Sequence, residues 1–186
     1  MRVSKPFVRE EPSVQHKRAQ FEAMAVPHLN AAFNLARWLT GYDQDAQDVV
    51  QDAYLRAFKF FDSYHGGDSR AWVLTIVRNC AYTWLRQNRM GVVPAELDDD
   101  LEDTEAISPE GSYLQEADYQ RLREAIAALP VEFREVIILH ELEGMAYKEI
   151  AAIASIPLGT VMSRLARARG WLQKSLIEDR NKEGER

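Results

Sequence analysis

Apolar side chains recur at three- and four-residue steps along much of this 186-residue chain, which is the period of an amphipathic helix. A first helical pattern runs from about Ala19 to Gly41, and Pro27 within it implies a kink or a late start. A second pattern begins near Asp43. After a loop with two adjacent glycines, a third runs from about Ser69 to Asn88. Because Gly and Pro are sparse elsewhere, the pattern predicts an all-α protein.

Residues 129–174 contain three more helical patterns, separated by short breaks. The first begins at Pro130, which suits a first helical turn because no internal N–H partner is needed there. A short pattern over Tyr147–Ala154 follows, and Pro157 then prevents its continuation. A longer helix is predicted from about Leu158 to Lys174. Two helices across a tight break form a helix-turn-helix, whose second helix can enter the DNA major groove.

The last predicted helix has two different faces. On a helical wheel the apolar positions Val161, Leu165, Ala168 and Leu172 fall together. The hydroxyl and cationic positions Thr160, Ser163, Arg167 and Lys174 lie well away from them, with Arg164 and Trp171 on the margin. Hydroxyls and guanidinium groups bind phosphate oxygens and base edges, so this face indicates DNA binding. The alternative is a solvated amphipathic helix with ordinary surface arginines.

The net charge of −6 is unusual for a DNA-binding protein, but the negative charge is concentrated in one segment. Between Met90 and Gln120 there are ten carboxylates and no Lys or Arg, so that the rest of the chain carries +4. Few large apolar residues occur there, and prolines interrupt it. We therefore predict a flexible acidic linker over residues 91–116, joining two small helical domains.

Other features exclude several classes of protein. No apolar run approaches the length of a membrane span, and the charged N-terminus does not resemble a signal peptide. The single cysteine, Cys80, excludes an internal disulfide and fits the reducing cytoplasm, and its apolar neighbours indicate a buried structural thiol. There is no glycine-rich phosphate loop, nucleophile elbow or paired His/Cys spacing, so we expect no enzyme, no cofactor and no metal site.

The N-terminal domain offers two candidate binding surfaces. Asp48, Gln51 and Asp52 share one side of their predicted helix, which is either simply solvated or a docking site for a basic partner helix. The third helix places aromatic rings such as Trp72 among several arginines, a combination that suits unstacked single-stranded bases. Core packing is the alternative for most of these rings, and Trp72, beside the glycines, is the one expected to be exposed.

Two stretches resemble a known family. Residues 43–86 resemble the second conserved region of bacterial RNA polymerase sigma factors, and residues 129–169 resemble the fourth. The linker is too short for a further domain, which is typical of the extracytoplasmic-function (ECF) group. The domains would then be a mobile arm at 1–18, region 2 at 19–90, the linker at 91–116, region 4 at 117–177 and a charged tail at 178–186.

The resemblance implies a function for each domain. Region 2 would open promoter DNA at the minus-ten element and hold flipped bases in the loop Asp62–Arg70. The residues expected to contact that strand are Tyr64, His65, Asp68, Ser69, Arg70, Trp72 and Asn79. Simple solvent exposure is the alternative for His65. The positions Asp48, Gln51 and Asp52 match those that dock on the clamp helices of core RNA polymerase.

Region 4 would read the minus-thirty-five element as duplex and contact the polymerase flap. The matching DNA-binding residues are Thr160, Ser163, Arg164 and Arg167, with Arg169 as phosphate support. Met162 and Ala166 depart from the family pattern, where a cation and a larger residue are common. The resemblance also implies an anti-sigma partner and a cytoplasmic location without membrane insertion. The alternative function is an autonomous helix-turn-helix regulator whose N-terminal domain senses a ligand or dimerises.

Overall fold

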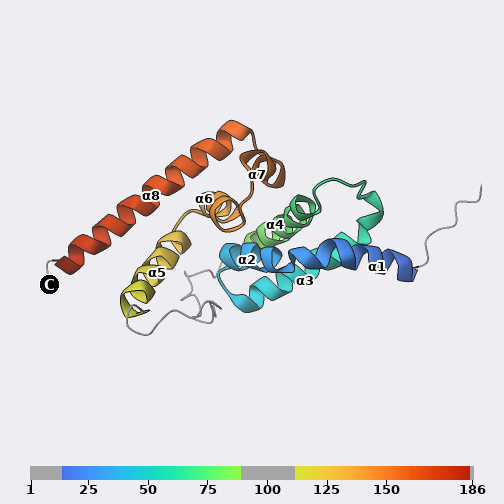
Figure 1. Ribbon diagram of the computed structural model, residues 1–186, viewed down its shortest axis with the longest axis horizontal. Helices are drawn as coiled ribbons and strands as arrows, with labels where there is room; N and C mark the ends of the chain where they lie inside the picture. The colour runs from blue at the N-terminus through green and yellow to red at the C-terminus, as the bar shows by residue number, and fades with distance from the viewer. Residues whose placement is uncertain (1–13, 89–111, 185–186) are drawn as a thin grey trace, which may run out of the picture.

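The computed structural model describes residues 14–88 and 112–184, and within these ranges the chain forms helices and turns without any β-strand (Figure 1). The all-α prediction is therefore confirmed. The α-helices are α1 (Val14–Ala25), α2 (Leu29–Thr40), α3 (Asp43–Lys59), α4 (Ser69–Asn88), α5 (Ser112–Ala127), α6 (Val131–Ile137), α7 (Tyr147–Ala154) and α8 (Leu158–Gly184). Short 3₁₀ turns follow α1 and α3, and a π-helical turn, Ile138–Leu142, extends α6.

Helices α1 to α4 form the N-terminal domain. Gly41 ends α2 in the left-handed conformation, with φ of 92°, and its N–H donates to the Arg37 carbonyl at 2.8 Å. Asp43 and Asp45 then occupy the first turn of α3, where carboxylates favour the positive end of a helix. The largest fully buried side chains of this domain include Leu35, Leu39, Val73, Leu74 and Val77. Cys80 is also buried, as predicted.

Helices α5 to α8 form the C-terminal domain, and its helix-turn-helix consists of α7 and α8. Ser155 ends α7 with φ of 54°, and the Ile156 N–H donates to the Ala151 carbonyl at 3.0 Å. The chain therefore changes direction before Pro157, and α8 begins at the next residue. At the other end of α7 the Glu149 carboxylate accepts the Ala146 N–H at 2.5 Å. The core of the domain is formed by Val136, Ile138, Leu139, Ile150, Ile153, Val161 and Leu165.

Three helices extend beyond their predicted limits, into segments that were predicted as arm, linker or tail. Helix α1 begins at Val14, within the predicted arm, and Pro27 lies in the 3₁₀ turn between α1 and α2. Residues 112–116, assigned to the linker from sequence, begin α5. Helix α8 continues to Gly184, through the segment predicted as a tail, because no Pro or Gly interrupts it between Gly170 and that residue. The remaining linker prediction, residues 91–111, lies outside the described residues.

The two domains pack directly against each other. Helix α6 lies against α2, and α7 lies against α4 (Figure 1). The Arg134 guanidinium of α6 donates to the Trp38 carbonyl of α2 at 2.8 Å, and also to the Ala127 and Leu129 carbonyls. Burial lowers the pKa of Arg134. The sequence predicted two tethered domains and gave no indication of this interface.

Candidate nucleic-acid and polymerase interfaces

Helix α8 divides into the two faces that the sequence predicts. Val161, Leu165 and Ala168 are buried against the rest of the domain. On the opposite side Ser163 and Arg167 are exposed. Thr160 is half-buried, and its carbonyl accepts the Ser163 hydroxyl at 3.0 Å. The outward face of the first part of α8 therefore presents hydroxyls and a guanidinium group to solvent, and there is no acid in the sequence from Leu158 to Lys174.

The other two predicted arginines of α8 are paired with carboxylates. Arg169 Nη2 lies 2.7 Å from Glu141 Oε1, and this hydrogen bond raises the pKa of the arginine. Arg164 Nη1 lies 4.0 Å from a carboxylate oxygen of Glu135, which is fully buried. In both cases a carboxylate of the same chain competes with DNA phosphates for the guanidinium group.

The glycine loop before α4 is held by stacked aromatic rings. The rings of Phe61 and Tyr64 are stacked with centroids 6.3 Å apart, and the Tyr64 ring lies 5.0 Å from that of Trp72. Gly66 and Gly67 both have positive φ, 91° and 104°, which other residues rarely adopt. The Tyr64 hydroxyl donates to the Gly67 carbonyl at 2.8 Å. Trp72, expected to be exposed, is half-buried because it packs in this aromatic group.

The end of the loop is fixed by side-chain hydrogen bonds. Asp68 precedes α4, and its carboxylate accepts the Ala71 N–H at 3.1 Å, as an N-cap does. That hydrogen bond is the main reason why the pKa of Asp68 is lowered. Ser69 Oγ lies 2.8 Å from His28 Nε2, which ties the start of α4 to the start of α2. Loop and helix are thus pre-formed around the predicted base-binding position.

The remaining predicted minus-ten residues differ in exposure. His65 and Asn79 are exposed. Arg70 is paired across the domain interface, where its Nη2 donates to Glu143 Oε2 at 2.5 Å. Glu143 also accepts from Asn34 Nδ2 of α2 at 3.3 Å. The structure therefore brings the loop residues together around α4, but it occupies Arg70 with a carboxylate of the C-terminal domain.

A second interdomain carboxylate, Glu135 of α6, was not singled out from the sequence. It is fully buried and accepts hydrogen bonds from Arg78 Nε at 2.5 Å and from the Tyr82 hydroxyl at 3.0 Å, both on α4. The Arg78 guanidinium also lies over the Tyr82 ring, 4.2 Å from its centroid. The one sequence feature that could have indicated it is an acid in the apolar run between Phe133 and Leu139.

The predicted polymerase-docking residues lie on one exposed side of α3. Asp48, Gln51 and Asp52 are all exposed. The Asp52 carboxylate lies 2.8 Å from Arg56 Nη2, one turn later. Burial is the main reason why the pKa of nearby Asp45 is raised, and the charge of Asp48 adds to this effect.

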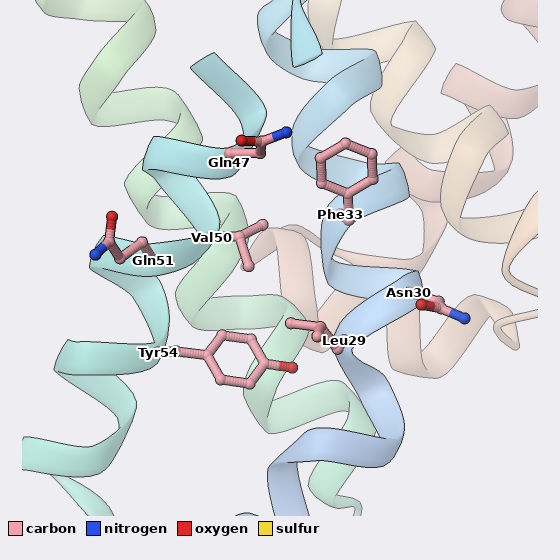
Figure 2. A pocket seen from close by; sticks show the side chains of 7 residues that line it. All are labelled: Leu29, Asn30, Phe33, Gln47, Val50, Gln51 and Tyr54. Carbon is pink, nitrogen blue, oxygen red and sulfur yellow. The ribbon is translucent and has the colours of Figure 1, made fainter. Parts of the chain in front are cut away.

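A groove of about 530 Å³ lies between α2 and α3, next to that acidic side (Figure 2). Val50 and Tyr54 extend from α3 toward Leu29 and Phe33 of α2. Gln51 belongs to both the groove and the acidic side. The N-terminal domain thus presents an apolar hollow with carboxylates beside it.

Both domains of this chain match known protein families. Residues 24–90 match the family model described as Sigma-70 region 2, and residues 119–172 match Sigma-70, region 4. The chain is 37% identical over 134 residues to the ECF RNA polymerase sigma-E factor of Escherichia coli, covering 67% of this chain and 70% of that protein. It is 33% identical over 156 residues to the ECF sigma factor EcfG of Rhodopseudomonas palustris, covering 83% and 82%. This chain belongs to the ECF group of sigma-70 factors.

Further relatives give the same assignment. This ECF sigma factor is 32% identical over 154 residues to SigE of Mycolicibacterium smegmatis, covering 81% of this chain and 59% of that longer protein. Among solved structures, the sigma factor RpoE of Bartonella quintana, crystallised with the anti-sigma factor NepR, matches with a TM-score of 0.68 and 31% identity. That match covers 85% of this chain and 97% of the other. CnrH in complex with the cytosolic domain of CnrY shares the fold, with a TM-score of 0.62 and 24% identity.

Two further properties concern only the part of the chain that the structure describes. Between residues 14 and 88 and between 112 and 184, no three His, Cys, Asp or Glu side chains lie where they could hold a metal ion together. No single helix in these ranges is long and apolar enough to cross a bilayer, and the one helix pair of sufficient apolar length is bent by 103°.

Proposed function

We propose that this ECF sigma factor binds core RNA polymerase in the cytoplasm and directs initiation at specific promoters, without a catalytic activity of its own. The observation that carries this proposal is the pairing of two domains in one sigma-70 chain. One has a glycine loop with packed aromatic rings at the start of α4, and the other has a helix-turn-helix with a polar outward face. Neither surface alone would distinguish a sigma factor from a simpler DNA-binding protein.

Region 4 reads duplex DNA at the minus-thirty-five element through α8. Thr160, Ser163 and Arg167 contact base edges and neighbouring phosphates, because their side of the helix faces solvent while the opposite side is buried. Arg164 and Arg169 act on phosphates after leaving their carboxylate partners.

Region 2 opens the minus-ten element and holds an unpaired base beside the glycine loop. Tyr64 and Trp72 offer ring faces for stacking, and the backbone at Gly66 and Gly67 has no side chain to obstruct a nucleotide. Asp68 and Ser69 position this loop, while His65, Arg70 and Asn79 supply polar contacts to the strand.

Core polymerase docks on the exposed side of α3. Asp48 and Asp52 attract a basic surface such as the polymerase clamp helices, and the groove between α2 and α3 receives an apolar side chain of the same partner. The polymerase flap contacts region 4. An anti-sigma protein that covers these surfaces is a further expected partner, and the Bartonella relative crystallised with NepR supports it.

Run-off transcription on a library of genomic promoter fragments tests the proposal. Purified chain and core polymerase together are expected to give discrete transcripts that share two spaced upstream elements, while core polymerase alone gives none of them. Absence of any chain-dependent transcript would refute the proposal. Four phosphate contacts give a slope of log affinity against log salt of only about −3.6, which is modest for DNA binding without polymerase. Tight, sequence-specific duplex binding by the chain alone at physiological salt would therefore favour an autonomous regulator.

A further inference from the structure

Helix α1 is joined to the loop between α3 and α4 by an ion pair that is long-range in sequence (Figure 1). Lys17 Nζ of α1 donates to the Asp62 carboxylate at 2.5 Å, and the two residues are 45 positions apart. Lys17 Nζ also lies 5.4 Å from the centroid of the Phe58 ring, near the end of α3. The Lys17 side chain is only 22% exposed, whereas that of Asp62 is 75% exposed. A largely covered lysine of α1 therefore holds an exposed carboxylate at the start of the loop.

A series of aromatic rings continues from α1 to the start of α4. Phe21, one turn after Lys17, is buried, and its ring lies edge-on at 5.5 Å from that of Phe61. The rings of Phe61 and Tyr64 are stacked, and the Tyr64 ring contacts that of Trp72. Ring pairs of this kind have preferred orientations. The position of α1 therefore sets the position of Tyr64 and Trp72, the two rings proposed to stack on a base.

The turn that carries Asp62 has little local structure to fix it. The N–H groups of Ser63 and Tyr64 donate to the carbonyls of Phe60 and Phe61 at 2.9 Å, which forms a single 3₁₀ turn. One isolated turn is unstable in water, because it fixes several backbone dihedrals for very few hydrogen bonds. Two adjacent glycines follow the turn and add further backbone freedom. Contacts with α1 are therefore needed to hold the turn in one place.

We propose that Lys17 is a positioning residue for the base-binding loop Asp62–Arg70, and that it influences the choice of base there by acting through Asp62. The ion pair holds the turn against α1, so that Tyr64 and Trp72 are in place before a base arrives. A site prepared in this way discriminates between bases better than one that must first be ordered. This inference rests on the proposed function, because it names a residue that determines the specificity of the same loop.

Substitutions of Lys17 test this proposal without unfolding the domain, because an ion pair that reaches the surface contributes little to global stability. Lys17→Met removes the charge and keeps a long side chain, whereas Lys17→Arg keeps the cation and should preserve the effect. Asp62→Asn removes the charge of the partner. Arg18→Met is the matched control, because the neighbouring Arg18 forms an exposed ion pair with Glu22 within α1, at 2.7 Å.

Amide hydrogen exchange in the free chain, followed by mass spectrometry, measures how firmly α1 holds the loop. In Lys17→Met the amides of Ser63 and Tyr64 are expected to exchange about threefold faster than in wild type, in proportion to the loss of one surface ion pair. Lys17→Arg and Arg18→Met should exchange at the wild-type rate. Unchanged exchange in Lys17→Met, or an equal increase in Arg18→Met, would overturn the proposal.

Run-off transcription with core polymerase, on promoters that differ at one base of the minus-ten element, measures the discrimination between bases. The ratio of product from the best base to that from the next should fall about threefold in Lys17→Met and in Asp62→Asn, and stay unchanged in Lys17→Arg and Arg18→Met. The double variant should lose no more than the worse single variant, since both substitutions break one pair.

Two results of the transcription experiment would overturn the positioning role. One is an equal loss of product at every base in Lys17→Met, as a merely structural role would give. The other is a double variant in which the two losses add, because Lys17 and Asp62 would then act separately. Absence of any transcript with the wild-type chain would refute the proposed function instead, and the exchange measurement on the free chain would still decide whether Lys17 holds the loop.

Discussion

Helices α4 and α8 are both assigned to DNA, yet the structure presents them in opposite ways. The polar face of α8 points to solvent, with Ser163 and Arg167 exposed. The corresponding part of α4 faces the other domain, where Arg70 and Arg78 are bound to carboxylates. One proposed DNA surface is exposed to solvent, and the cations of the other are paired with carboxylates of the neighbouring domain.

A substitution on the inward face of α8 should lower the free energy of unfolding more than any other change considered. Leu165→Ala removes a side chain that is only 1% exposed and leaves a cavity, at a cost of about 3 kcal/mol in the free energy of unfolding. Met162→Ala, at a position that is 53% exposed, should change it by less than about 0.5 kcal/mol. Urea unfolding monitored by circular dichroism measures both. Equal losses would mean that α8 does not have one buried and one free face.

The loop beside α4 should show the largest effect on transcription. Trp72→Ala removes a stacking surface worth about 2 kcal/mol per base, so run-off product should fall at every promoter, whether or not it has an upstream element. Trp72→Phe keeps a ring and should restore much of the activity. If Trp72→Phe were as defective as Trp72→Ala, packing against Tyr64 rather than stacking on DNA would explain the loss.

The outward face of α8 should show a smaller and more selective effect. Arg167→Ala removes an exposed guanidinium group, and we expect a loss of about 1.5 kcal/mol in apparent promoter affinity, confined to promoters that depend on the upstream element. Gln173→Ala, also exposed on α8, serves as the control. The assignment of α8 to the minus-thirty-five element fails if promoters lacking that element lose as much activity.

Polymerase docking on α3 should respond to charge. Asp52→Arg reverses a carboxylate that now pairs with Arg56, and we expect core polymerase to bind about fivefold more weakly. Gln44→Arg, which places a cation elsewhere on α3, should have little effect. An unchanged dissociation constant for Asp52→Arg, measured by fluorescence anisotropy of labelled chain, would show that these carboxylates are merely solvated.

The smallest effect concerns Cys80 in the core of region 2. Burial raises the pKa of its thiol from 9.0 to about 11, so the folded thiol stays protonated while an unfolded one would ionise. This contribution to stability is complete below pH 9 and is lost as the pH rises toward 11. Iodoacetamide at pH 8 should therefore alkylate the native chain far more slowly than the chain in urea. Equal rates would show that the thiol is accessible.

Local sequence signals predicted most of the fold. The start of α4 near Ser69 followed from the loop with two adjacent glycines before it, and the turn between α7 and α8 followed from Pro157. The interface between the domains could not be predicted, because its partners are distant in sequence. Glu135 binds side chains 57 and 53 residues earlier, and helical periodicity contains no information on such pairs.

The candidate sites divide in the same way. The two faces of α8 and the exposure of Asp48, Gln51 and Asp52 could be predicted from the helical period alone. The half-burial of Trp72 could not, because it depends on how the loop folds back to place Tyr64 against it. Nor could the pairing of Arg70, whose carboxylate partner lies 73 residues later.

Opening of promoter DNA exposes unpaired thymines, and their reactivity toward permanganate measures that opening. On a promoter found by run-off transcription, thymines of the minus-ten element should become reactive only when both this chain and core polymerase are present. Replacing that element should abolish the reactivity. Reactive thymines with core polymerase alone, or none with both proteins on a transcribed promoter, would contradict the account.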